Sequence, residues 1–465
     1  MDNSQKISPK VIGAIIATGI MSFCGVVVET AMNITFPTLM QEFGISTSTV
    51  QWMTTIYLLV VAMIVPLSAV MKRSFRTKSL FITANLLFII GLVLDAAAPI
   101  FPILLLGRVV QGCGTGIALP LMFNIILEQV PESKIGMMMG VGSLITAIAP
   151  AVGPTFGGFV VSTLGWRFIF IFLLPILVVS LLVGLFSIQQ KSKVRRTHFD
   201  VLSMLEIAVT FIGLVYGFSS MGKGTFLSVT SLLPILIGII ALGMLVHRSN
   251  AIKTPIIHLD ILKNGLFAGH LVAFFALQLL TLGLSFVLPN YVQLVNHSSA
   301  SIAGILVFPG AAIGAVFAPF GGRILDKFGA RKPILTGSGF CLVAMLLFVA
   351  LGMHLTNWMV LCFYFLYMIC VGLSFGNIMT SGLSHLGDDR QADGNATLTT
   401  LQQLSGAVGT SVVSAIVAHA QVTGAGTASK AVLTASGSEH AFIFMLILAL
   451  IEAGTLFKVV KDNNQ

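Results

Sequence analysis

The chain has 465 residues, of which 56% are hydrophobic and only 9% are charged, and its net charge is +9. Soluble domains carry about 25% charged residues, so water is not the main solvent of this protein. The composition excludes an ordinary soluble enzyme or binding module and predicts a polytopic membrane protein.

Apolar runs of about 20 residues or more, long enough to cross a bilayer as helices, recur along the whole chain. The first run lacks an A-x-A cleavage site and leads straight into the next, so we expect a retained span rather than a signal peptide. We therefore predict an all-α fold with fourteen transmembrane helices, at residues 11–40, 51–71, 79–98, 101–127, 135–161, 167–188, 202–221, 227–247, 266–290, 301–321, 333–353, 358–385, 395–422 and 441–458.

Two polar connections, 189–201 and 248–265, divide these spans into six, two and six. Short basic connections after the second and the tenth span occupy corresponding points of the two six-helix sets, as in transporters built from duplicated halves around a midplane site. The predicted organisation is an N-terminal six-helix bundle over 1–190, a linker with two helices over 191–250, and a C-terminal six-helix bundle over 251–465.

The basic residues fall on one side of the predicted membrane. With the N-terminus in the cytoplasm, 21 of the 25 Lys and Arg residues lie inside, Arg167, Lys223 and Lys430 lie outside, and Arg108 lies within a span. The positive-inside rule then predicts a multi-pass protein of the cell membrane with both termini cytoplasmic. Anionic lipid head groups account for the basic charge, so the bilayer is the expected partner and nucleic acid is not.

Cysteine and histidine give no sign of a metal site. All five Cys residues lie within apolar spans, without a CxxC pair or a His at ligand spacing, which is typical of packing residues. We expect neither a metal nor a cofactor.

Arg108 lies inside the fourth span, where contact with lipid would cost about 2.5–3.5 kcal/mol. We expect its side chain to face protein or a water-filled cavity, the alternative being an arginine near the helix end that extends to the membrane surface. Gln111 and three glycines follow, and such small residues allow close helix packing.

The fifth span contains Pro150, Gly153, Pro154, Gly157 and Gly158 within nine residues. Proline removes a backbone donor and glycine removes side-chain bulk, so this helix should bend and pack tightly against a neighbour.

A charged turn follows the tenth span, with Gly322, Asp326 and Arg331 at its centre. Asp326 can accept hydrogen bonds from nearby arginines or cap a helix, which predicts a gating latch between adjacent helices. The alternative is an ordinary solvated loop.

Four carboxylates lie within predicted spans: Glu29, Asp95, Glu206 and Glu452. Asp95 and Glu206 lie near helix ends and are expected to reach water, whereas Glu452 on the last helix is expected to pack or to face lipid. Glu29 is deep in the first span and is the best candidate for a proton carrier, with Arg108 as its charged neighbour and Asp95 as a further candidate.

Polar side chains at Asn33, Gln111, Asn124 and Gln278 are candidates for a substrate cavity. The chain also has 34 Phe and 20 Met residues, which suit a flexible cavity for lipophilic substrates and are equally common as lipid-facing or packing residues.

Two other classes of protein fit the sequence poorly. An ATP-driven pump needs a phosphate-binding loop, but the nearest match, residues 217–224, ends in Gly where Ser or Thr must bind magnesium. An enzyme site would need the cluster of Asp388, Asp389, Asp393 and His385, which is more typical of a solvated turn. We expect no enzymatic activity.

Several motifs, in order and on the expected spans, resemble the major facilitator superfamily over essentially the whole chain, and most closely its fourteen-helix drug:proton antiporter branch. The segments are ETAMNITFPTLM, WMTTIYLL, GRVVQGCGTG, APAVGPTFGG, GWRFIFIFLLP, GGRILDKFGARK and GNATLTTLQQLSGAVGTS.

The resemblance implies roles for particular residues. Gly153, Pro154, Gly157 and Gly158 are similar to the antiporter motif, which marks exporters and lines the contact between the halves. Arg108 and Gln111 are similar to the helix 4 motif linked to proton coupling. Glu29 and Asn33 occupy the helix 1 motif, in which many members have an acidic residue at the position of Val28. The connection after the second span lacks the family's acidic residue, so the charged latch is complete only in the C-terminal half.

The resemblance implies a proton-coupled antiporter that exports lipophilic or cationic drugs and other toxic compounds by alternating access. Small molecules and protons would be its partners, and the chain would act as a monomer. The main alternative is a dedicated exporter of one native solute, such as a signalling nucleotide, lipid or peptide, that exports drugs incidentally. An uptake symporter fits the Gly-Pro motif less well.

Overall fold

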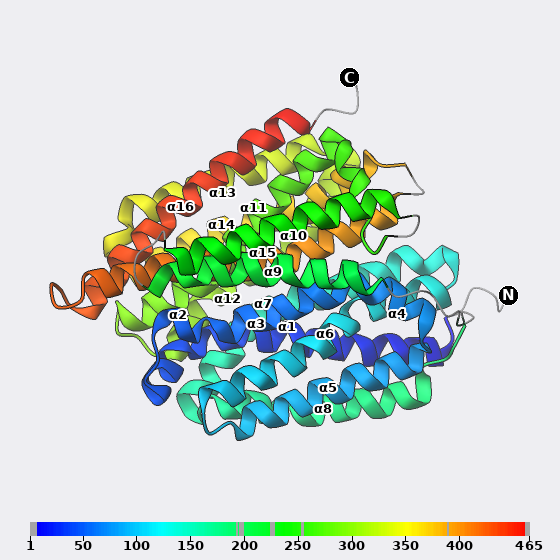
Figure 1. The fold of residues 1–465 in the computed structure, drawn as a ribbon, viewed down its shortest axis with the longest axis horizontal. Coiled ribbons are helices and arrows are strands. Elements are labelled where there is room, and N and C mark those ends of the chain that lie inside the picture. The colour runs from blue at the N-terminus through cyan, green and yellow to red at the C-terminus, as the bar shows by residue number, and fades with distance from the viewer. Residues whose placement is uncertain are drawn as a thin grey trace.

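The computed structural model describes residues 7–191, 194, 200–223, 228–252, 255–387 and 390–460. Long helices, packed side by side in alternating directions, make up nearly all of these residues (Figure 1). We call the end of the bundle where the first helix begins and the last helix ends the terminal face, and the opposite end the distal face.

Most helix limits lie within a few residues of the predicted spans, and the largest difference is at the start of the last helix, residue 430 against the predicted 441. Their bounds are α1 Pro9–Phe43, α2 Thr47–Val50, α3 Trp52–Ile64, η2 Val65–Leu67, α4 Ser68–Ser74, α5 Thr77–Ala97, α6 Phe101–Gln129, α7 Glu132–Thr163, α8 Arg167–Ser187, α9 Val201–Ser220, η3 Met221–Lys223, α10 Val229–Ala251, η4 Leu259–Lys263, α11 Gly265–Leu294, α12 Ala300–Phe328, α13 Arg331–Leu351, η5 Gly352–His354, α14 Asn357–Ser384, α15 Gln391–Thr423 and α16 Lys430–Val459.

Thirteen helical stretches in the described part of the chain are long and apolar enough to cross a membrane. The fifth predicted span, 135–161, lies within α7, whose described apolar stretch is the shorter Ile148–Thr163. The prediction of an all-α polytopic membrane fold is confirmed.

Helix ends follow local chemistry. After α1 the chain turns at Gly44, whose φ of 62° is the left-handed conformation that glycine adopts without strain. Asn264 caps the start of α11, because its side chain accepts hydrogen bonds from the backbone N–H groups of Leu266 and Phe267. With 35 residues, α1 is about 52 Å long and extends beyond the hydrocarbon core at its ends.

The helices form two bundles that meet along a seam. Helices α1, α3, α5, α6, α7 and α8 pack on one another, and so do α11 to α16. Across the seam α7 packs on α12, α3 on α15, and α1 on α11. Helices α9 and α10 pack mainly on each other and lie on the outside of the seam, where α9 contacts α15 and α3 (Figure 1).

Outward faces of α8, α9 and α10 are apolar. Phe186, Leu205, Leu236 and Ile240 are each more than half exposed, which is the arrangement of side chains in contact with lipid tails. The two linker helices therefore present a lipid-facing surface beside the seam.

Candidate functional site

Arg108 on α6 is fully buried inside the first bundle. Its Nε donates to the carbonyl oxygen of Met53 at 2.9 Å and its Nη1 to Oε1 of Gln111 at 2.6 Å. The guanidinium carbon lies 4.2 Å from the ring centroid of Tyr57, a cation–π contact. Arg108 thus faces protein, and the alternative of a side chain reaching the membrane surface is wrong.

Asp95 on α5 joins the same group of side chains. Gln111 donates from Nε2 to Oδ2 of Asp95 at 2.6 Å, so one amide connects the carboxylate to the guanidinium. We call Asp95, Gln111 and Arg108 the Arg108 relay. The expectation that Asp95 reaches water is wrong, because its side chain is fully buried.

Two glycines explain this burial. A Cβ on Gly91 of α5 would lie 2.8 Å from the carbonyl oxygen of Gly107 on α6, and a Cβ on Gly107 would overlap the carboxylate of Asp95. The helices therefore approach closely enough for Asp95 to lie over α6 instead of turning outward. In the sequence, the glycine directly before Arg108, Gly107, was the feature that could have indicated this close contact between α5 and α6.

The Arg108 relay has two polar atoms with no partner. Oδ1 of Asp95 and Nη2 of Arg108 are buried and make no hydrogen bond. An unsatisfied buried group costs about 1–3 kcal/mol, and more when it is charged. Buried polar atoms without a partner are exceptions in native structures, so they mark the Arg108 relay as a candidate functional site.

Glu29 lies on α1, half-buried, and within electrostatic reach of both Arg108 and Tyr57. The Tyr57 hydroxyl donates to the carbonyl oxygen of Gly25, one turn before Glu29, at 2.9 Å and lies 2.9 Å from Oγ1 of Thr115 on α6. Tyr57 therefore connects α3, α1 and α6 beside the relay. Sequence reasoning assigned no role to Tyr57, although its motif WMTTIYLL was evident.

The four residues expected in a substrate cavity have different surroundings. Asn33 accepts from Thr54 at 2.8 Å and donates to Ser285 of α11 at 2.9 Å, so it bonds across the seam. Gln111 belongs to the Arg108 relay. Asn124 on α6 is half-buried and Gln278 on α11 is buried. Two of the four therefore have polar partners within the protein.

The glycines of α7 lie in its contacts with both bundles. A Cβ on Gly157 would lie 2.8 Å from the carbonyl oxygen of Ala31 on α1, and Gly153 packs on Thr30 of the same helix. Gly158 packs instead on Ala300 at the start of α12. Helix α7 is therefore held between α1 of its own bundle and α12 of the other.

Hydrogen bonds across the seam gather at the distal face. Gln293 donates to the carbonyl oxygen of Ile34 at 3.0 Å, and the Ser301 hydroxyl donates to the carbonyl oxygen of Gly158 at 3.2 Å. Thr47 donates to Oε1 of Gln421 at 2.7 Å. These bonds join α11 to α1, α12 to α7 and α2 to α15, so the two bundles are clasped at the distal face.

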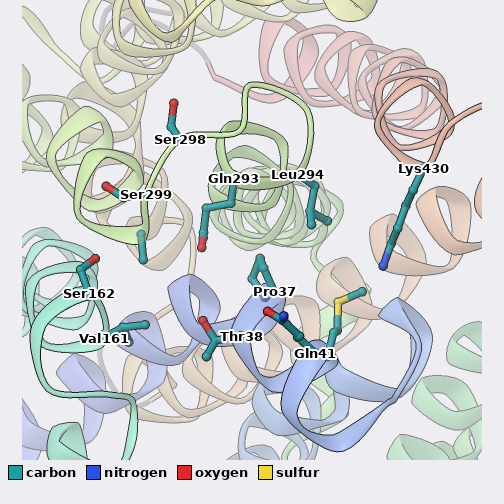
Figure 2. Close-up of a pocket in the computed structure, with 12 residues that line it drawn as sticks. Pro37, Thr38, Gln41, Val161, Ser162, Gln293, Leu294, Ser298, Ser299 and Lys430 are labelled. Atoms are coloured by element: carbon teal, nitrogen blue, oxygen red, sulfur yellow. The ribbon is translucent and has the colours of Figure 1, made fainter.

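A cavity of about 580 Å³ lies at the distal face (Figure 2). The ends of α1, α7 and α11 line it together with Lys430 from the start of α16, whose side chain extends toward Gln41. Neither Glu29 nor the Arg108 relay contributes to its lining. This cavity is a vestibule on the distal side of the clasp.

The remaining candidates lie apart from the relay. Gly322 is half-buried, and the Arg331 guanidinium lies 5.6 Å from the ring centroid of Phe457, whereas the side chain of Asp326 lies outside the described residues. The gating latch stays a prediction.

The two other acids are both buried. Glu452 accepts from Ser338 of α13 at 3.0 Å and is fully buried, so it packs and does not face lipid. Glu206 is only 6% exposed, so the expectation that it reaches water is wrong.

The acidic cluster near α15 is only partly described. Asp388 and Asp389 lie outside the described residues, and Asp393 lies 3.7 Å from Arg390 in an ion pair. Within the described ranges, no group of three His, Cys, Asp or Glu side chains is placed to hold a metal ion.

Comparison with known proteins agrees with this architecture. The family model described as the Major Facilitator Superfamily matches residues 18–410. The lincomycin resistance protein LmrB of Listeria monocytogenes is 36% identical over 96% of both chains, and that of Bacillus subtilis is 34% identical over 95% of this chain and 94% of the relative. A multidrug resistance protein B homolog of Mycobacterium tuberculosis is 26% identical over 91% of this chain and 79% of its own.

Solved structures share the fold at low sequence identity. The crystal structure of a D-xylose-proton symporter superimposes with a TM-score of 0.70 at 13% identity, covering 98% of this chain and 99% of its own. The POT family transporter PepTSo gives a TM-score of 0.71 at 12% identity, with the same coverage.

Proposed function

This chain belongs to the Major Facilitator Superfamily, and on that basis we propose that it is a proton-coupled antiporter that exports lipophilic or cationic drugs across the cell membrane by alternating access. We place it in the fourteen-helix branch, as a monomer, with the terminal face in the cytoplasm because the predicted topology assigns 21 basic residues to that side. Relatives named for lincomycin resistance support drug export and make lincomycin the first substrate to test.

One observation carries the proposal of proton coupling: Glu29 and Asp95 share a single buried cation, Arg108. With both carboxyl groups ionised, these three side chains carry a net charge of −1, and with one protonated they are neutral. Net charge in a water-free environment is unfavourable, so a sealed site favours the protonated form. A conformational change that admits water then releases the proton.

Glu29 is the member that exchanges the proton in this proposal. It is half-buried on α1, whereas Asp95 is fully buried in the relay. Protonation of Glu29 weakens its attraction on Arg108, whose Nη2 has no hydrogen-bond partner. Because Arg108 donates to Met53 and Gln111, a movement of the guanidinium is transmitted to α3 and α6. A ligand shifts a two-state equilibrium only through such differential contacts.

The clasp at the distal face supports an inward-facing state, since the terminal face is cytoplasmic in our assignment. Alternating access requires the seam to open at one face while it closes at the other. Gly157 and Gly158 place α7 against α1 and α12 without intervening side chains, so the bundles can rock about this contact.

The energetics are sufficient for export. One proton moving inward at ~100 mV contributes ~2.3 kcal/mol from the membrane potential alone. Since 1.4 kcal/mol is a factor of ten, this corresponds to about fortyfold accumulation of a neutral substrate.

The test replaces Glu29 by Gln and measures gradient-driven efflux in vesicles. We expect Glu29→Gln to abolish uphill transport while downhill exchange of substrate continues. Glu452→Gln is the matched control, because Glu452 is also a buried carboxyl group but bonds to Ser338, away from Arg108. Undiminished uphill transport by Glu29→Gln rules out this assignment.

A resistance panel tests the substrate range. We expect overproduction to raise resistance to lincomycin and to several cationic dyes. Resistance to one compound alone indicates instead a dedicated exporter.

A further inference from the structure

A groove of about 570 Å³ lies on the two linker helices, near the terminal face and away from the Arg108 relay. Its lining includes Glu206 of α9, a stripe along α10 formed by Ile240, Gly243, Met244 and His247, and Arg248 at the terminal end of that helix. The residues on α10 recur at intervals of three and four, so they form one face of the helix. The volume is in the range of sites that hold small molecules.

The wall of the groove faces the bilayer. Ile240 and Met244 are more than half exposed, and a Cβ on Gly243 would meet no atom within 4 Å. A molecule that enters from the membrane therefore meets an apolar wall with an open space at Gly243.

Glu206 is the chemical feature that selects the occupant. It is only 6% exposed, and its Oε2 is buried without a hydrogen-bond partner. The hydrogen bonds of the nearby Arg248 go to Asp200 instead, with Nη2 2.7 Å from Oδ1 and Nε 3.1 Å from Oδ2. Arg248 also lines the groove and attracts Glu206 electrostatically, so Asp200 and Glu206 share one guanidinium, and the three ionised side chains carry a net charge of −1.

The depth of Glu206 along α9 distinguishes this groove from a binding site for a phospholipid head group. Asp200 precedes the first residue of α9, and Glu206 lies six residues further, about 9 Å along the helix. A phospholipid would need a cation for its phosphate, and Arg248 is occupied by Asp200. A molecule with one positive charge and an apolar body fits the carboxylate and the apolar wall together.

We propose that the groove between α9 and α10 is a binding site for lipophilic organic cations taken from the membrane, with Glu206 as the counter-ion and Ile240, Gly243 and Met244 as the apolar wall. This site goes beyond the export cycle proposed above and requires no proton gradient. It would concentrate cations beside α15 and α3, which α9 contacts at the seam.

The test uses a photoreactive dodecylammonium probe with the full-length protein in phosphatidylglycerol nanodiscs. We expect the probe to label peptides of α9 and α10, and dodecyltrimethylammonium to compete whereas dodecanol does not. Glu206→Gln should weaken this competition about tenfold, equivalent to ~1.4 kcal/mol. Gly243→Leu should block labelling by filling the groove. Gly454→Leu, at a lipid-facing glycine of α16 with equally open surroundings, should leave it unchanged.

Three results would overturn the site. These are equal competition by dodecanol and dodecyltrimethylammonium, unchanged labelling in both Glu206→Gln and Gly243→Leu, and displacement of the probe by phosphatidylethanolamine but not by dodecyltrimethylammonium. Because labelling is measured without a gradient, a failure of proton-coupled export leaves the result intact, and the two proposals fail separately.

Discussion

Replacing Arg108 by Lys keeps the positive charge but removes the planar guanidinium, so it tests whether the shape of that group contributes to stability. Arg108 makes two hydrogen bonds, from Nε to Met53 and from Nη1 to Gln111, while its plane lies on Tyr57. Hydrogen bonds to a charged group contribute about 1.5–3 kcal/mol each. The single Lys nitrogen can replace one of the two, so we expect Arg108→Lys to lower the free energy of unfolding by about 2 kcal/mol.

Replacing Arg108 by Gln removes the charge as well and leaves two carboxyl groups without their cation. Breaking a buried ion pair by removing one partner costs about 3–5 kcal/mol, so this variant should be the less stable of the two. Unfolding in mixed micelles with increasing dodecyl sulfate, followed by circular dichroism, gives both values. The reasoning is refuted if Arg108→Lys unfolds within about 0.5 kcal/mol of the wild type, or if Arg108→Gln is at least as stable as Arg108→Lys.

Two further predictions concern the packing of α7 and the ion pair at the start of α9. A Cβ added at Gly157 would lie only 2.8 Å from the carbonyl oxygen of Ala31, so we expect Gly157→Val to lower export at least tenfold at equal membrane abundance. Gly339→Val is the control and should export normally, because a Cβ added there would meet no atom within 4 Å. Normal export by Gly157→Val would contradict the role of this contact. The hydrogen bonds from Arg248 lower the pKa of Asp200 from 3.8 to about 2. The ionised carboxylate therefore stabilises the fold fully above pH 3.8, and this stabilisation is lost as the pH falls through about 2. Asp200→Asn should therefore lower the melting temperature slightly at pH 6 and not at pH 2, and an equal difference at both pH values would show that the ion pair is not responsible.

The membrane fold was predictable because each span is a long apolar run with turn signals at its ends. Predicted and observed limits differ most where polar residues extend a helix beyond the apolar run, as at α16, which begins at Lys430 rather than at the predicted 441, and at α12, which ends at Phe328 rather than at the predicted 321. Helical hydrogen bonding continues past the apolar run, because an amphipathic or polar end can remain helical in the interface.

The candidate site was predictable as a set of residues but not as an arrangement. Arg108 was recognised because a charge within a span needs a partner, yet sequence distance gave no information on which partner it finds. Asp95 was expected at the surface from its place near a helix end, and close packing at Gly91 and Gly107 buries it instead. Tyr57 was missed because an aromatic residue in an apolar helix is usually a packing residue.

Proton movement in reconstituted vesicles tests the central claim most directly. Liposomes that contain the purified protein are given a pH gradient, with the membrane potential clamped to zero by potassium and valinomycin, and ethidium, a permanent cation, is present on both sides at equal concentration. We predict that ethidium accumulates in the acidic compartment while protons leave it, and that Glu29→Gln shows neither movement. Equal ethidium on both sides at equilibrium, with the wild-type protein present and the gradient maintained, would contradict proton-coupled export.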